Sequence, residues 1–242
     1  MRAGHLIRPD TMDLLEPTRD AFALLLRGDP ELLQIIWLSI WLSLTAIALI
    51  SPPSIALGFL LAKRRFPGQR AVVVLVQALL SFPTVVIGLI IYLLLSRRGP
   101  LGSFELLFSP TAIVIGYMVI AFPILVVFTV SAVQGADPRV YETARSLGAS
   151  PVQAAFTTLR EVRFGIIAAI VNAFGRVVSE VGCAIMVGGN IAGLTRNMPT
   201  AIALETSKGD FAQGIALGMV LMALAVGINV LMALLQGEGG LK

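Results

Sequence analysis

Five long apolar stretches divide this sequence, and each is about as long as, or longer than, a helix that crosses a lipid bilayer. They cover residues 32–62, 71–95, 110–133, 164–187 and 211–235. A helix needs about 20 residues to cross the hydrocarbon core. Only 13% of the residues are charged and 57% are hydrophobic, whereas about a quarter of a soluble domain is charged. The pattern therefore predicts an all-α integral membrane protein that sits in a lipid bilayer.

Residues 1–31 form a polar leader, and residues 32–242 form one transmembrane domain. The patch from Leu14 to Leu26 has the mixed character of an amphipathic helix that lies on a membrane, and a flexible leader is the alternative. Prolines lack the amide that a helix needs, so they are expected to kink or divide the spans that contain them. These prolines are Pro52 and Pro53 in the first span, Pro83 in the second and Pro123 in the third.

Basic residues gather in two of the loops, at 63–70 and at 139–163. Loops rich in Lys and Arg stay on the cytoplasmic side of a membrane. Two spans separate these loops, so both can lie on that side. The resulting topology has the N-terminus outside and the C-terminus inside, with polar outer loops at 97–110 and 188–210.

The loop at 135–163 is patterned as a short helix–turn–helix. Asp137 can cap a helix that has Pro138 in its first turn, and Gly148 can end it in a left-handed conformation. Ser150 and Gln153 have the spacing of a capping box that opens a second helix. We interpret this hairpin as a docking element for a soluble partner; a solvated hairpin without a partner is the alternative.

The fourth span carries a polar stripe, formed by Asn172, Arg176, Ser179, Glu180 and Cys183. On a continuous helix these side chains fall within an arc of about 100°. An ionised group in the bilayer costs about 2.5–3.5 kcal/mol, so the stripe should face protein or water. It is interpreted as the lining or gate of a translocation path. Alternatively, Arg176 and Glu180 only neutralise each other while they hold helices together.

Other functions find little support in the residues. The sequence has no G-x-x-x-x-G-K-[ST] phosphate loop, so nucleotide hydrolysis by that device is not expected. A single His5 and a single Cys183 cannot build a metal cluster, and no cofactor is expected in the chain. No basic stripe with interleaved aromatic residues indicates nucleic-acid binding. An integral-membrane enzyme stays a remote alternative, since no catalytic constellation is recognisable.

The hairpin resembles a known motif. Glu142, Thr143, Ala144 and Gly148 resemble the "EAA…G" loop of permease subunits in binding-protein-dependent ABC importers. Thr143 replaces the expected second alanine, and the motif's later I-x-L-P portion, which would fall on 158–161, does not match. In that family the loop forms cytoplasmic coupling helices that contact the ATPase subunit.

A longer resemblance covers Gly175 to Glu205, GRVVSEVGCAIMVGGNIAGLTRNMPTAIALE. It is similar to permeases for molybdate, sulfate and tungstate, and most similar to the tungstate branch. The resemblance implies a type I ABC importer permease fold with about five transmembrane helices. It also implies a homodimer, two ATPase subunits that bind ATP and Mg, an extracytoplasmic oxyanion-binding protein, and a bacterial or archaeal cytoplasmic membrane.

The end of the fourth span supplies a candidate outer vestibule. Gly188, Gly189 and Asn190 can offer backbone and side-chain amides to an oxyanion, and Arg196 adds positive charge. A helix stop and turn is the alternative for the same residues. Within transport, another small solute such as an amino acid is the alternative substrate.

Overall fold

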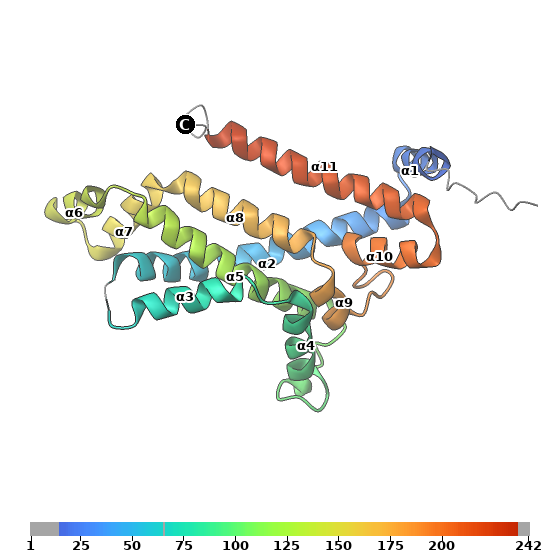
Figure 1. The fold of residues 1–242 in the computed structure, drawn as a ribbon, viewed down its shortest axis with the longest axis horizontal. Helices are drawn as coiled ribbons and strands as arrows, with labels where there is room; N and C mark the ends of the chain where they lie inside the picture. The colour runs from blue at the N-terminus through green and yellow to red at the C-terminus, as the bar shows by residue number, and fades with distance from the viewer. Residues whose placement is uncertain (1–14, 65, 237–242) are drawn as a thin grey trace, which may run out of the picture.

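The computed structural model describes residues 15–64 and 66–236, and every regular element in these ranges is helical. Figure 1 labels the elements in chain order. They are α1 (Leu15–Arg27), α2 (Pro30–Lys63), α3 (Gln69–Leu79), α4 (Thr84–Leu95), the 3-10 turn η1 (Gly102–Phe104), α5 (Pro110–Gln134), α6 (Pro138–Ser146), α7 (Pro151–Glu161), α8 (Arg163–Val178), α9 (Gly182–Gly188), α10 (Met198–Lys208) and α11 (Phe211–Gln236).

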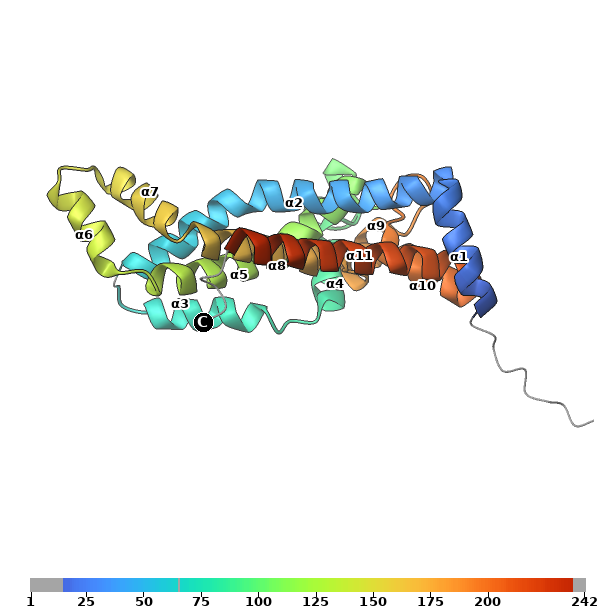
Figure 2. The same cartoon turned by 90° about the horizontal axis from the view of Figure 1, so that it is seen from above.

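Four long helices, α2, α5, α8 and α11, run along the long axis of the molecule (Figures 1 and 2). The most enclosed of the candidate spans is α5, which packs against both α2 and α8. The hairpin α6–α7 lies at one end of the molecule, and α1 and α10 lie at the other. The chain therefore places two sets of short helices at opposite ends of the bundle.

Helix α2 is continuous over 34 residues, so of the two expected effects of Pro52 and Pro53, a kink or a division, the division is wrong. Asp29 caps its start by accepting the amide of Leu32 at 3.1 Å. The second half of α2 lies close to α5: a Cβ on Gly58 would come within 2.7 Å of the Thr129 side chain. Packing on α5 thus supports the helix past the two prolines. Helix α5 likewise continues through Pro123.

The predicted spans at 71–95 and 164–187 are not single straight helices. Helices α3 and α4 meet at 96°, and α8 and α9 meet at 61°. Pro83 occupies the N-cap position of α4 without a side-chain capping bond, and α3 ends before it because proline has no amide to donate to the preceding turn. By length and composition, three described helices could cross a membrane, or up to five spans if each bent pair counts as one.

The predicted polar loop at 188–210 contains a packed helix, α10, which contradicts that part of the prediction. Asn197 and Thr200 form a capping box, with Pro199 in the first turn. Asn197 and Thr200 are buried, together with Met198 between them. The polar residues that predicted a loop here are buried, and their hydrogen-bonding groups find partners inside the protein.

The predicted amphipathic patch corresponds to α1, which packs on α11 and buries Ala21 completely. Figure 2 shows α1 lying across the end of the bundle. Residues 1–14 of the predicted leader and residues 237–242 lie outside the described residues. The contact of α1 with a membrane surface stays a prediction.

Candidate functional site

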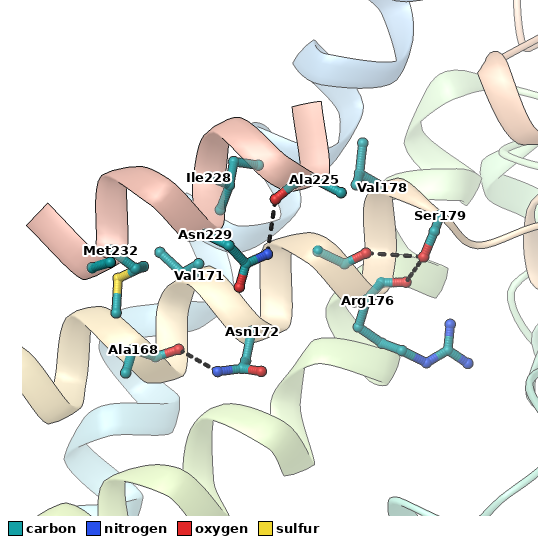
Figure 3. Close-up of a pocket in the computed structure, with 12 residues that line it drawn as sticks. Ala168, Val171, Asn172, Arg176, Val178, Ser179, Ala225, Ile228, Asn229 and Met232 are labelled. Carbon is teal, nitrogen blue, oxygen red and sulfur yellow. Dashed lines mark hydrogen bonds between the residues drawn. The ribbon is translucent and has the colours of Figure 1, made fainter. Parts of the chain in front are cut away.

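A hollow of about 600 Å³ lies between α8 and α11. Figure 3 shows its polar side chains among apolar ones. Three of them, Asn172, Arg176 and Ser179, belong to the stripe predicted from the sequence. The fourth, Asn229 of α11, was missed because it is a single asparagine within the last apolar stretch. An amide in a bilayer span is itself a signal of function, and that signal could have identified it.

The neutral polar groups of this hollow are held on their own helices. The amide nitrogen of Asn172 donates to the carbonyl of Ala168 at 3.0 Å, and that of Asn229 donates to the carbonyl of Ala225 at 2.8 Å. The hydroxyl of Ser179 donates to the carbonyl of Gly175 at 2.9 Å. Each asparagine keeps its carbonyl oxygen and one further N–H for other contacts.

Arg176 and Glu180 form the ion pair that the sequence predicted. Their Nη1 and Oε2 atoms are 2.6 Å apart, and the side chains are 43% and 3% exposed. The other carboxylate oxygen accepts the backbone amide of Cys183 at 3.1 Å. Glu180 therefore turns away from the hollow and holds the first turn of α9, while Arg176 stays at the hollow.

The stripe does not continue to Cys183. Helix α8 ends at Val178, so the helical arc no longer applies beyond it. The thiol of Cys183 is buried close to Gly116 of α5. The prediction that Cys183 shares the polar face is wrong, because the carboxylate of Glu180 starts a new helix in another direction.

The predicted vestibule residues form a tightly bonded turn after α9. Gly188 is buried, and Gly189 has a left-handed φ of 71° with its amide donating to the carbonyl of Ile185 at 3.0 Å. Asn190 donates from its side-chain amide to the carbonyl of Thr200 at 3.3 Å. The expectation that the Gly189 amide is free for an anion is therefore wrong, and the helix stop describes it correctly.

Arg196 forms an ion pair with Glu31 at the start of α2. Its Nη1 lies 3.4 Å from Oε1 of Glu31, and its side chain is only 16% exposed. Its backbone amide donates to the carbonyl of Ile191 at 3.0 Å. Arg196 thus belongs to the same end of the molecule as Asn190, as the sequence suggested, but an acidic partner offsets part of its charge.

The hairpin α6–α7 has the caps that the sequence predicted. The Asp137 carboxylate accepts the amide of Arg139 at 2.9 Å, and Gly148 has a φ of 90°. Ser150 and Gln153 form the reciprocal capping box. Glu142 and Thr143 lie exposed on α6, and Ala144 is half-buried.

Apolar side chains protrude from this hairpin. Leu147 is 83% exposed, Val152 is 65% exposed and Phe156 is 69% exposed. Large apolar side chains grouped on a small element indicate a contact surface for another macromolecule. One aromatic contact ties α6 to the bundle: the Tyr141 ring lies 6.4 Å from that of Phe59, with Lys63 Nζ 5.3 Å from the Tyr141 centroid.

Comparison with known proteins identifies the chain's family. The family described as "Binding-protein-dependent transport system inner membrane component" matches residues 54–237. The chain belongs to this family. The prediction that the chain is a permease subunit of the inner membrane is confirmed. The chain is a transport component and not an enzyme.

Two relatives are similar to this permease over most of their length. The "Probable anion ABC transporter permease protein" of Haloferax volcanii is 41% identical over 209 residues, which are 83% of this chain and 88% of the relative. The "Tungstate uptake system permease protein TupB" of Peptoclostridium acidaminophilum is 37% identical over 225 residues, 93% of this chain and 99% of the relative.

Solved structures support the same architecture. A bacterial alginate ABC transporter, crystallised in complex with an alginate pentasaccharide-bound periplasmic protein, has a TM-score of 0.71 at 17% identity. The match covers 93% of this permease and 89% of that chain. The predicted all-α type I ABC importer permease fold is confirmed.

Proposed function

We propose that this permease is the membrane subunit of an ATP-driven importer for a tetrahedral oxyanion, and that tungstate is its substrate. The observation that carries the proposal is the similarity to the tungstate uptake permease, which extends over 99% of that relative. Molybdate, sulfate and an amino acid are the alternative substrates, and the experiment below distinguishes them.

The hollow between α8 and α11 suits the passage of an anion. Its polar lining consists of Asn172, Ser179 and Asn229, which are neutral, and of Arg176, which is cationic. The nearest carboxylate on the same helix run, Glu180, is buried and paired. An unpaired carboxylate would repel an oxyanion strongly where water is scarce. We therefore place the translocation path along this hollow, with the Arg176–Glu180 pair as a gate that shapes it.

The turn after α9 is our candidate for the outer vestibule. Arg196 supplies the positive charge there, while Gly188, Gly189 and Asn190 hold the shape of the turn. This assigns the glycines a structural role and leaves the electrostatic role to the arginine. An extracytoplasmic binding protein would deliver the ion to this vestibule.

The hairpin α6–α7 is our candidate for the contact with the ATPase. Glu142, Thr143, Ala144 and Gly148 match the family's coupling motif. The exposed side chains Leu147 and Val152 offer apolar area that a protein groove can cover. The proposed assembly has two copies of the permease, two ATPase subunits and one extracytoplasmic binding protein.

Reconstituted uptake tests this proposal. The permease, its genomically neighbouring ATPase and the neighbouring secreted binding protein are assembled in proteoliposomes. We expect ATP-dependent uptake of labelled tungstate. Unlabelled tungstate should inhibit this uptake more strongly than molybdate or sulfate does. Calorimetry of the binding protein with the same three ions gives an independent ranking. Uptake of an amino acid, without any oxyanion uptake, would overturn the proposal.

A further inference from the structure

A second hollow, of about 730 Å³, lies where the hairpin returns to the bundle. It is separate from the hollow between α8 and α11, and α2, α7 and α8 contribute its walls. Its apolar walls include Ile55 of α2, Phe156 and Leu159 of α7, and Ile166 of α8. Water in contact with these apolar walls is unfavourable, so an apolar group that fills the hollow is stabilised there.

Two arginines stand at this hollow. Arg160 lies in the last turn of α7, and Arg163 is the first residue of α8, so they flank the break between the two helices. Both are exposed. The Arg163 guanidinium lies 4.9 Å from the centre of the Phe164 ring. Within residues 15–64 and 66–236, neither guanidinium forms a hydrogen bond or an ion pair with an acidic group.

One acidic residue, Glu161, lies between the two arginines in the sequence, which leaves one net positive charge over residues 160–163. Glu161 is exposed and is not part of the wall of the hollow. The site therefore combines a cationic rim with an apolar interior. An anionic phospholipid has the complementary pattern: a phosphate that guanidinium groups bind through paired hydrogen bonds, and acyl chains that aliphatic side chains accept.

We propose that this hollow binds one anionic phospholipid of the cytoplasmic leaflet, with its phosphate at Arg160 and Arg163 and an acyl chain against Ile55 and Ile166. The leaflet follows from the proposed function, which places the hairpin on the cytoplasmic side. The lipid would fill the angle between the docking hairpin and the bundle. Its chemistry is that of an anionic headgroup lipid, and phosphatidylglycerol serves as the probe.

Native mass spectrometry of the full-length permease tests the site. The protein is delipidated in detergent and titrated with phosphatidylglycerol or with zwitterionic phosphatidylcholine. We expect one phosphatidylglycerol per chain to bind in preference to phosphatidylcholine. Each basic residue near an anionic lipid surface contributes about 1 kcal/mol, so Arg160→Gln or Arg163→Gln should weaken the binding about five-fold. The double variant should weaken it about thirty-fold.

A matched control and a second variant keep the outcome decisive. Arg139→Gln removes an exposed arginine on α6 that does not line this hollow, and it should leave the binding unchanged. Ile166→Trp fills the apolar part and should reduce binding with both arginines intact. Equal binding of phosphatidylglycerol by the wild type and the double arginine variant would overturn the proposal.

Two further results bear on the site. Displacement of the bound lipid by a saturating ATPase subunit, or by dimer formation, would assign the hollow to a protein and would also overturn the proposal. The proposed substrate is judged separately by uptake. A permease that carried another solute would still bind the lipid, so the two proposals can fail independently.

Discussion

Two pairs of short helices, α6–α7 at one end of the molecule and α9–α10 toward the other, use the same local devices with opposite burial. At one end, Gly148 and the Ser150 capping box join α6 to α7; at the other, Gly189 and the Asn197 capping box lie between α9 and α10. Helix α6 has no buried residue, whereas Asn197 and Met198 are fully buried. Capping signals thus specify a turn, and they do not specify whether it faces water or protein.

The chemistry of the buried hairpin explains this difference. Asn197 donates from its side-chain amide to the hydroxyl of Tyr117 at 3.0 Å, and the amide of Met198 donates to the hydroxyl of Ser39 at 2.6 Å. Ser150 bonds only within its own helix, to Gln153 in the capping box and to the amide of Ala154. Long-range partners on α5 and α2 therefore hold the start of α10 inside the protein, whereas the α6–α7 hairpin contacts the bundle through Tyr141 and leaves Leu147 exposed.

Labelling from each side of the membrane tests the comparison most sharply, because its result is all or none. The exposed positions Gln153 and Ala192 lie in the two hairpins. We expect Gln153→Cys to react only from the cytoplasm and Ala192→Cys only from outside. The buried Cys183 is the single native cysteine, so the wild type gives the background. Labelling of both positions from the same side would refute the topology.

The ion pair that anchors α9 should give the next largest effect. Removing one partner leaves the other charge unpaired, and this costs more than removing both. Arg176→Gln and Glu180→Gln should each lower oxyanion uptake by about ten-fold or more at matched protein levels. The double variant should recover part of the loss. Strictly additive losses would mean that the residues do not act as a pair.

The two capping residues give a paired test of burial. Asn197→Ala removes a cap and leaves the Tyr117 hydroxyl without its donor in the protein interior. We expect a loss of about 3 kcal/mol in the free energy of unfolding. Ser150→Ala removes an exposed cap and should cost about 1 kcal/mol. Thermal unfolding of both variants in the same detergent compares them, and equal shifts would contradict the distinction.

Two glycines separate a docking effect from a folding effect. Gly148 and Gly209 both have left-handed backbones, with φ of 90° and 84°, and a Cβ on either would meet nothing within 4 Å. A β-branched residue should therefore strain both by about 1–2 kcal/mol. We expect Gly148→Val to lower binding-protein-stimulated ATP hydrolysis about five-fold, and Gly209→Val to lower it much less. Equal losses would remove the special role of the hairpin.

Much of the exposed end could be predicted from the sequence, because its structure is local. Asp137, Gly148 and Ser150 act through backbone groups within three residues or by their own φ angle. The Arg176–Glu180 pair is also local, at one helical turn. These features need no knowledge of the neighbouring helices.

The buried end and the second half of the hollow could not be predicted, because they depend on packing. Residues 188–210 resemble a loop by composition, and the partners Ser39 and Tyr117 bury the start of α10 inside the protein. Asn229 acquires its place beside Asn172 from the contact between α11 and α8. Proline was overestimated as a breaker at Pro52, Pro53 and Pro123, where packing of α2 on α5 supports both helices.

Helix α2 is continuous, and it contacts both pairs of short helices. In its first half Ser39 accepts the amide of Met198, and near its C-terminal end Phe59 and Lys63 contact the ring of Tyr141. Twenty helical residues separate Ser39 from Phe59, which is about 30 Å at 1.5 Å per residue. A tilt of about 5° pivoting at Ser39 would carry Phe59 about 2.6 Å sideways. The helix can thus convert a small rotation at the α9–α10 end into a displacement of an aromatic ring at the α6–α7 hairpin.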